Sequence, residues 1–221
     1  MSDAAPASAR NAVVAAALDL FVANGFEATS VEQIAQAAGV SRSTFFRQFG
    51  GKDDVVFTDH DLLLARLRTF LTAPHENPWG AVCEASLDVF HHFAADPELA
   101  RRRYAVVRQV PALREREIVT VFQYERLFDE YLREALPGID PVESVAFAAA
   151  VTAVHNHVLR RLLRGAAVPA SVLSDAYDDL MHRFGVHPDG EPPARDDVVI
   201  ATFPRRMPAA EVVRRLRSEL G

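Results

Sequence analysis

Side chains that can contact nucleic acid are concentrated between Ser41 and Lys52. Arginine can read guanine, glutamine can read adenine, and serine or threonine hydroxyls can contact either bases or phosphates. The segment contains Arg42, Arg47 and Lys52 but no acidic residue, although the whole chain has a net charge of −6. These residue types therefore predict a small basic surface that contacts DNA in an otherwise acidic protein.

Such a surface needs a short helix held against a preceding one, and the flanking residues predict both. Ser30 precedes an apolar-periodic run and Gln33 follows three residues later, so the two can form a capping box. Gly39 can end this first helix, and Ser41 can cap a second one. The spacing predicts a helix-turn-helix unit whose second helix enters a DNA major groove. The alternative is two helices of an ordinary bundle with a solvated face.

Residues 29–52 resemble the amino-terminal domain of the tetracycline-repressor (TetR) family of transcriptional regulators. The matching residues are Ser30, Ile34, Ala35, Ala38, Gly39, Val40, Ser41, Thr44, Phe45, Phe49 and Lys52. The resemblance implies a DNA-binding surface made of Ser30, Arg42, Ser43, Thr44, Phe46, Arg47, Gln48 and Lys52, with Lys52 on a phosphate. Phe46 stands where the family usually has a tyrosine, so its expected contact is apolar, for example with a thymine methyl.

The composition favours a mainly α-helical chain. It has 221 residues, of which 49% are hydrophobic and only 10 are glycine, and its apolar residues recur at helical spacing, so we expect an all-α fold. The single cysteine, Cys83, excludes an internal disulfide, and burial is the favoured interpretation over a redox-sensing thiol. The sequence shows neither an apolar run of membrane-spanning length nor a signal-peptide pattern, so a cytoplasmic location is expected.

Proline and glycine divide the chain into three expected parts. These are a helix-turn-helix DNA-binding domain (1–54), a helical ligand-binding and dimerisation domain (55–187), and a linker with a carboxy-terminal extension (188–221). Besides the helix-turn-helix, helices are predicted over residues 8–24, 53–71, 79–95, 97–109, 111–136, 141–164 and 169–184. In the extension, the residue pattern predicts a short strand at 198–203 and an amphipathic helix at 208–220.

Small residues in the helix at 141–164 allow close helix approach, and the helix at 169–184 offers larger apolar residues, so both are candidates for dimerisation. The TetR resemblance implies that the last two body helices of each subunit form an intersubunit four-helix bundle. A two-fold dimer would place two recognition helices about one turn of DNA apart. The residues expected at this interface are Val145, Ala149, Val154, Leu173, Tyr177 and Leu180. The alternative is a core helix pair within one chain.

Large apolar and aromatic residues dominate the middle of the chain, where the resemblance implies a ligand cavity. Its expected lining is Phe90, Phe93, Arg101, Tyr104, Val107, Arg108, Phe122, Leu127, Tyr131, Phe147, Val151 and His155. The stretch 101–128 also resembles regulators with acyl-CoA-like ligand-binding domains. In that case Arg101–Arg103 would meet phosphates bidentately. A solvated helical turn is the alternative for these arginines.

No residue pattern predicts catalysis. The histidine pairs His91/His92 and His155/His157 lack the i, i+4 spacing of zinc-binding helices. We therefore expect no metal, no other cofactor and no enzyme activity. The prediction is a homodimeric transcriptional regulator, foremost a repressor, released from a palindromic operator by a small hydrophobic ligand such as an acyl-CoA. The alternatives are an enzyme with an accessory DNA-binding segment and an adaptor that acts through the tail helix.

Overall fold

The regular structure of the described residues is entirely helical. The computed structural model describes residues 4–186 and residue 212. The helices are α1 (Ala4–Asn24), α2 (Val31–Ala37), α3 (Arg42–Phe49), α4 (Lys52–Thr72), α5 (Pro78–Ala95), α6 (Pro97–Gln109), α7 (Pro111–Ala135), α8 (Pro141–Leu163) and α9 (Ser171–Arg183). The all-α prediction is confirmed for this part of the chain, and the helices predicted from residue 79 onward end within two residues of the observed ones. The predicted strand at 198–203 and nearly all of the predicted helix at 208–220 lie outside the described residues.

The first three helices form an amino-terminal domain with its own apolar centre. Ser30 and Gln33 form the predicted capping box, with backbone-to-side-chain hydrogen bonds of 2.8 and 3.2 Å at the start of α2. Gly39 has a φ of +66°, a conformation that glycine adopts without steric cost, and it lets the chain turn between α2 and α3. Ser41 then caps α3 by accepting a hydrogen bond from the Thr44 N–H. The predicted helix-turn-helix is confirmed.

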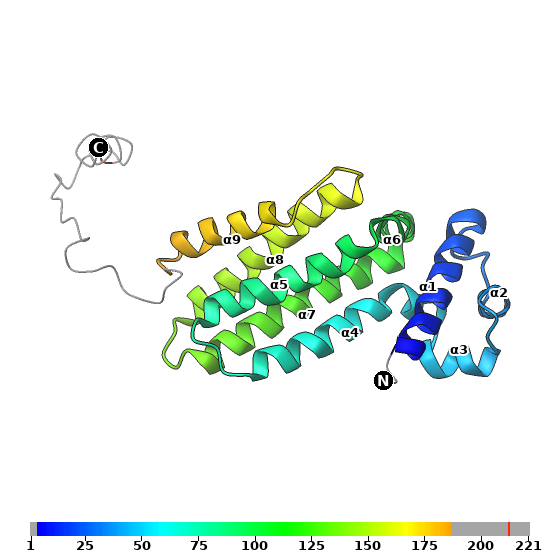
Figure 1. The fold of residues 1–221 in the computed structure, drawn as a ribbon, viewed down its shortest axis with the longest axis horizontal. Coiled ribbons are helices and arrows are strands. Elements are labelled where there is room, and N and C mark those ends of the chain that lie inside the picture. Colours follow the sequence, from blue (N-terminus) through cyan, green and yellow to red (C-terminus); the bar gives the residue numbers. More distant parts are fainter. Residues whose placement is uncertain (1–3, 187–211, 213–221) are drawn as a thin grey trace.

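The long helices α4, α5, α7, α8 and α9 lie roughly side by side and form the body of the molecule (Figure 1). The most extensive packing is between α7 and α8, and α8 also packs against α5 and α9. Their apolar faces meet in one core whose largest fully buried side chains are Leu67, Phe90, Phe128, Leu132, Phe147, Leu173 and Tyr177. Among the described helices only α8 has the length and hydropathy of a membrane-spanning segment, and its packing in this core accounts for that composition.

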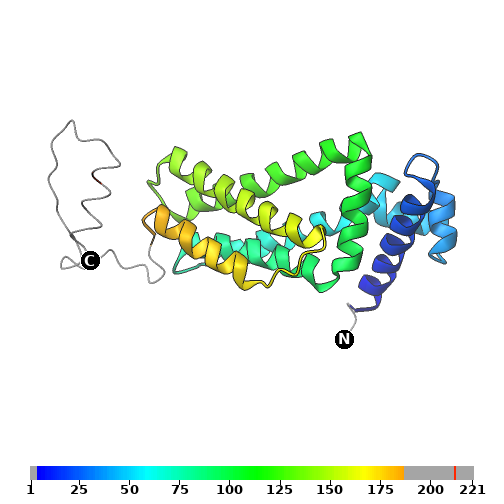
Figure 2. The same cartoon turned by 90° about the horizontal axis from the view of Figure 1, so that it is seen from above.

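Helix α6 lies across one end of the body, beside α1 (Figure 2). It contacts α1 of the amino-terminal domain as well as α5, α7 and α8 of the body. Val106 and Val107 of α6 and Leu113 of α7 belong to the apolar cluster of the amino-terminal domain, together with residues 55–57 of α4. The packing therefore continues across the predicted domain boundary at residue 54, and α6 joins the two parts of the molecule.

Candidate nucleic-acid interface and body cavity

The outer face of α3 carries polar side chains on a firmly packed helix. Phe45 and Phe49 are almost completely buried, and their ring centres lie 5.3 Å apart against the core of the amino-terminal domain. Arg42, Ser43 and Arg47 are exposed. A helix fixed in this way can present exposed cations and a hydroxyl to a DNA groove without moving relative to α2.

Contacts with neighbouring side chains orient one end of this face. The Nε of Arg42 lies 3.0 Å from a carboxylate oxygen of Glu32 on α2, and its guanidinium lies 5.4 Å from the centre of the Phe46 ring. The Phe46 ring is itself 41% exposed, so the apolar contact predicted for it is sterically open. Thr44 is half-buried, and its hydroxyl accepts a hydrogen bond from Ser41.

Ser30 and Lys52 have partners inside the protein, although both are expected on DNA. The Ser30 hydroxyl caps α2. Lys52 donates a hydrogen bond of 2.8 Å to the carbonyl oxygen of Phe26, and its ammonium lies 4.3 Å from the centre of the Phe26 ring. These contacts attach the first residue of α4 to the loop after α1, which is a structural role, and the phosphate contact of Lys52 stays a prediction. Gln48 is half-buried, and its Oε1 has no hydrogen-bond partner among the described residues.

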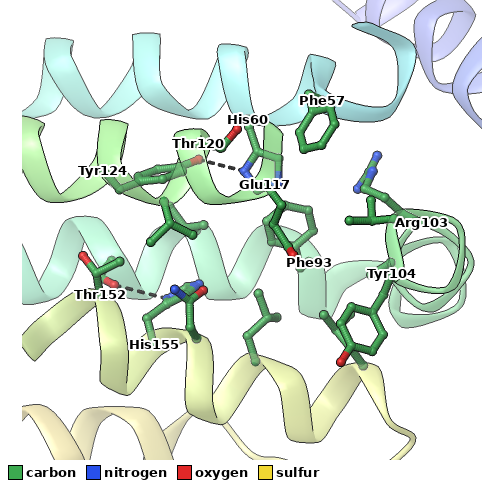
Figure 3. A pocket seen from close by; sticks show the side chains of 18 of the residues that line it. Phe57, His60, Phe93, Arg103, Tyr104, Glu117, Thr120, Tyr124, Thr152 and His155 are labelled. Atoms are coloured by element: carbon green, nitrogen blue, oxygen red, sulfur yellow. Dashed lines mark hydrogen bonds between the residues drawn. The ribbon is translucent and has the colours of Figure 1, made fainter. Parts of the chain in front are cut away.

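A cavity of about 90 Å³ lies in the body, where α4, α5, α6, α7 and α8 meet. It has room for about three water molecules at their volume in the liquid. Figure 3 shows part of its wall, including Phe57 and Phe93. The wall is largely aromatic and aliphatic and also contains Val89, Val107, Phe128 and Leu159. Polar side chains reach it from every one of these helices, as expected of a site that orients a small molecule.

The most buried cation of this wall is Arg103, whose side chain is 7% exposed. Its Nη2 donates to a carboxylate oxygen of Asp59 on α4, and its guanidinium lies 5.6 Å from the centre of the Phe93 ring. His92 of α5 approaches the same carboxylate oxygen at 3.5 Å. Burial raises the pKa of Asp59, but the hydrogen bond from His92 and the charge of Arg103 outweigh it and lower the pKa to about 2. Asp59 is therefore ionised, and it neutralises Arg103 within the wall.

Two histidines of the wall are held neutral. Burial, with the positive charge of Arg103, lowers the pKa of His60 to about 3, and the His60 Nδ1 lies 3.2 Å from the Tyr124 hydroxyl. Burial also lowers the pKa of His155 to about 4. Its Nδ1 lies 3.2 Å from the Ser86 hydroxyl, which in turn lies 2.6 Å from the hydroxyl of Tyr177. The two histidines can therefore offer neutral donor or acceptor nitrogens to a ligand.

The cavity contains some of the residues that the sequence predicted and leaves out others. Phe93, Tyr104, Val107 and His155 line it. Phe90, Phe147 and Val151 instead pack in the body core. Leu127 and Tyr131 line a second, more open groove of about 590 Å³ between α4 and α7. Arg101, Arg108 and Phe122 do not line the cavity: Arg101 pairs with Glu98, Arg108 is exposed, and Phe122 is 61% exposed.

The cavity also contains residues that were outside the predicted lining. Phe57 and His60 belong to α4, a helix that contributes no residue to the predicted lining. The sequence suggests an arginine cluster at 101–103, whereas Arg101, Arg102 and Arg103 have three different partners in the structure. The useful signal would have been helical phase, because three consecutive residues of a helix lie about 100° apart and cannot share one face.

The residues predicted at a dimer interface divide into two groups. Val145 is 47% exposed, and Ala149 and Val154 are partly exposed on α8. Leu173, Tyr177 and Leu180 of α9 are at most 8% exposed and belong to the body core of a single chain. These α9 residues therefore fit the alternative to a dimer interface, which is a core helix pair within one chain. A second copy could meet α8 but not their buried side chains.

The described residues contain no group of three or more histidine, cysteine, aspartate or glutamate side chains that could hold a metal ion. Cys83 lies in the core of the body, where burial raises the pKa of its thiol to about 12. A thiol with so little thiolate character at neutral pH is a poor nucleophile and a poor redox sensor.

Comparison with known proteins identifies the amino-terminal part of the chain. Residues 13–57 match a family described as bacterial regulatory proteins, tetR family. The HTH-type transcriptional regulator TcmR of Streptomyces glaucescens is 42% identical over 71 residues, which make up 32% of this chain and 30% of TcmR. The matched stretches cover only 30% to 50% of the length of the curated relatives.

Solved structures extend the likeness to the body. NalD of Pseudomonas aeruginosa, described as the secondary repressor of the MexAB-OprM multidrug efflux pump, is 23% identical, with a TM-score of 0.52 over 80% of this chain and 94% of the NalD chain. SmeT, solved as a complex with triclosan, is 19% identical, with a TM-score of 0.58 over 91% of this chain and 99% of the SmeT chain. At these identities the likeness shows the fold alone.

Residues 13–57 thus resemble the DNA-binding segment of bacterial tetR-family regulatory proteins, and the solved structures share the all-α fold of this chain.

Proposed function

We propose that the protein is a DNA-binding transcriptional regulator, acting as a repressor, whose affinity for its operator depends on a small molecule in the body cavity. The observation that carries this proposal is the exposed set Arg42, Ser43 and Arg47 on a helix whose opposite face is buried. Two arginines and a hydroxyl on one short helix can make both base and phosphate contacts. The proposal also places the protein in the cytoplasm, where its DNA is.

A homodimer follows from the size of one such surface, because a single recognition helix makes few base contacts. The exposed side of α8 is apolar or small, with Val142, Val145, Ala146, Ala149 and Ala153. The neighbouring α7 adds exposed Ile118, Val119 and Phe122. Large apolar side chains gathered on adjacent helices favour a protein partner over solvent. We assign this surface to the second copy, with Ala149 and Val154 near its centre and Val145 toward one end.

The cavity is the proposed effector site because its wall includes helices that also reach the amino-terminal domain. Phe57 of α4 and Val107 of α6 line the cavity and also belong to the apolar cluster around α1–α3. A ligand that favours one arrangement of α4 and α6 would therefore favour one position of α3. Release from DNA then requires only that the ligand bind the non-binding conformation more tightly. The triclosan complex of SmeT supports a small-molecule effector for this fold.

An acyl-CoA is the second candidate for the effector. It would need cations that converge on its phosphates, and the three consecutive arginines of α6 have separate partners: Arg101 pairs with Glu98, Arg102 with Asp19, and Arg103 with Asp59. A long acyl chain also exceeds a cavity of about 90 Å³ unless the helices move apart. A compact, mostly apolar molecule fits the observed wall better.

The test begins with fragmented DNA from the source genome, passed over the purified protein. We expect retention of a few fragments that share a palindrome with half-sites about one helical turn apart, and affinity that falls steeply with salt. Operator release is then titrated with an acyl-CoA chain-length series and, in parallel, with planar aromatic compounds. Failure to retain any specific fragment would contradict the regulator. Release by acyl-CoA alone would make acyl-CoA the effector in place of a compact molecule.

A further inference from the structure

The wall of the body cavity has one charge that the protein itself does not balance. Among the described residues, the charged members of the wall are Arg103 and Glu117. Arg103 pairs with Asp59, whose carboxylate is ionised, so the charge of Arg103 is neutralised. His60 and His155 are uncharged, because burial lowers the pKa of each. The carboxylate of Glu117 is therefore the charge that remains.

The carboxyl group of Glu117 also lacks a close partner. It forms neither a hydrogen bond nor an ion pair with any residue that the structure describes. Burial raises the pKa of Glu117, and the charge of Arg160 on α8 offsets this effect only in part. A partly buried carboxylate without a partner is unfavourable, and native structures usually supply a donor or a cation. In the wall of a cavity, a ligand can supply both.

A molecule in the cavity can reach this carboxylate. Glu117 lines the cavity from α7 and is partly exposed. Its two carboxylate oxygens keep accessible surface, unlike the enclosed Nε of Arg103. Figure 3 shows Glu117 among the side chains that surround the cavity, together with His60 and Phe93. Glu117 is therefore a group that a bound ligand can contact directly.

The volume of the cavity limits the size of that ligand. About 90 Å³ equals the liquid volume of about three water molecules, so a molecule of about three or four non-hydrogen atoms fits without movement of the helices. The rest of the wall includes the aliphatic side chains of Val89, Val107 and Leu159. The part of the ligand that faces away from Glu117 is therefore a short hydrocarbon group.

The charges of the wall decide which polar group the ligand carries. An anion would enter beside the Glu117 carboxylate without a free cation to balance it, which is strongly unfavourable. A neutral alcohol can donate one hydrogen bond but leaves the charge of Glu117 unbalanced. A primary ammonium group supplies a positive charge and three N–H donors, and it forms charge-assisted hydrogen bonds with a carboxylate.

We propose that the effector is a short primary alkylammonium ion of about the size of ethylammonium, whose ammonium group binds the carboxylate of Glu117 and whose alkyl group fills the cavity. The proposal rests on the proposed function in one respect, namely that the cavity is the effector site. Arg116, the residue before Glu117 on α7, lies 2.7 Å from Asp54 near the start of α4. The ligand is thus held by the neighbour of the residue that connects α7 to the helix following α3.

Three probes of similar size test the ligand class, namely ethylammonium chloride, ethanol and sodium acetate. Each is titrated at pH 7.5 and constant ionic strength into the full chain without DNA, and NMR follows the methyl signals of Val89 and Val107 in the cavity wall. We expect a dissociation constant on the order of 1 mM for ethylammonium, near the limit for so few atoms, and about tenfold weaker binding of the other two. A comparison compound that binds as tightly as ethylammonium, or no response to any probe, would overturn the proposal.

A longer homologue tests the size limit. The n-hexylammonium ion has the same charge, but its chain exceeds the volume of the cavity. We expect it to shift the same methyl signals with lower affinity than ethylammonium. Equal or tighter binding of n-hexylammonium would contradict the proposed size of the effector.

A Glu117→Gln variant then tests the residue, because glutamine retains the shape of the side chain without its charge. The matched control is Glu115→Gln on the same helix, which removes an exposed carboxylate that does not line the cavity. We expect the advantage of ethylammonium over ethanol to disappear in Glu117→Gln and to persist in Glu115→Gln. An advantage that persists in Glu117→Gln, or that both variants lose, contradicts the assignment. If Glu117→Gln does not fold, the ranking of the probes on the unaltered chain still decides the ligand class.

Operator binding is measured separately on the unaltered chain, so the two proposals fail independently. A protein that retains specific DNA but ranks the probes otherwise contradicts the alkylammonium effector alone. A protein that ranks the probes as expected but retains no DNA contradicts the regulator and leaves a ligand-binding protein.

Discussion

Arg102 and Arg103 are consecutive residues of α6, yet they pair with carboxylates in different parts of the molecule. Arg102 pairs with Asp19 of α1 in the amino-terminal domain, whereas Arg103 pairs with Asp59 of α4 beside the cavity. A third ion pair connects α7 to the start of α4, with 2.7 Å between the Nη1 of Arg116 and a carboxylate oxygen of Asp54. Helix α6 is therefore attached by ion pairs to the amino-terminal domain and to the cavity wall. A shift of α6 would change the contacts of both parts.

The two α6 ion pairs differ in burial, and their contributions to stability should differ accordingly. Asp59→Asn leaves Arg103 buried without a counter-charge, so we expect a loss of about 3–5 kcal/mol in the free energy of unfolding. Asp19→Asn breaks a pair whose carboxylate is 59% exposed, and the expected loss is below about 1 kcal/mol. Urea denaturation of both variants measures the difference. Equal losses would contradict the structural distinction between the two pairs.

Stability should fall with acid because two cavity histidines are held neutral. Their pKa values in the folded protein, about 3 for His60 and about 4 for His155, lie below the unfolded value near 6.5. The unfolded chain therefore binds protons first as the pH falls from about 6.5, and each histidine costs up to about 1.4 kcal/mol per pH unit in this range. Denaturation at pH 7.5, 6 and 5 should show the decline.

The matched variants for this pH dependence are His60→Phe and His91→Gln. The first removes a buried histidine and should make stability less sensitive to pH between 7.5 and 5. The second replaces an exposed histidine of α5 and should leave the slope unchanged. A slope that His60→Phe does not reduce would mean that His60 is not the group that takes up the proton.

Local patterns were sufficient to predict the helices but not which side of each helix faces the cavity. Capping residues and prolines mark helix ends, so the boundaries of α5–α9 were predictable to within two residues. Phe122 and Phe147 look alike in the sequence, yet one is exposed and the other is fully buried against Trp79 and Phe184. That difference depends on how α5, α7, α8 and α9 pack together. Local patterns in a single sequence do not determine this packing. Lys52 is a similar case, since its partner Phe26 lies 26 residues away.

Replacement of these two phenylalanines should separate core packing from surface association. Phe147→Ala removes a ring that is 0% exposed, so we expect it to lower the free energy of unfolding by about 3–5 kcal/mol. Phe122→Ala should change the stability of the protomer by less than about 1 kcal/mol, because the ring is 61% exposed. Urea denaturation at a low, fixed protein concentration compares them. A loss on Phe122→Ala as large as that on Phe147→Ala would place Phe122 in the core.

The proposed dimer surface can be tested with one charge on α8. Ala149→Glu would bury an unpaired carboxylate between the two copies, so sedimentation should show monomer and operator affinity should collapse. Ala65→Glu adds the same charge to an exposed position on α4 and serves as the control that leaves the dimer intact. If the Ala149→Glu protein still sediments as a dimer, the interface lies elsewhere.

The role of α3 in DNA reading is tested most directly by operator affinity measured over a range of salt concentrations. The proteins to compare are the unaltered chain, Arg47→Ala on the exposed face of α3, and Arg66→Ala, which removes a surface arginine of α4 paired with Asp88. We predict that Arg47→Ala weakens specific binding by about 1–3 kcal/mol, while Arg66→Ala leaves both the affinity and its salt dependence unchanged. Operator affinity that is the same for Arg47→Ala and the unaltered chain at every salt concentration would contradict DNA reading by α3.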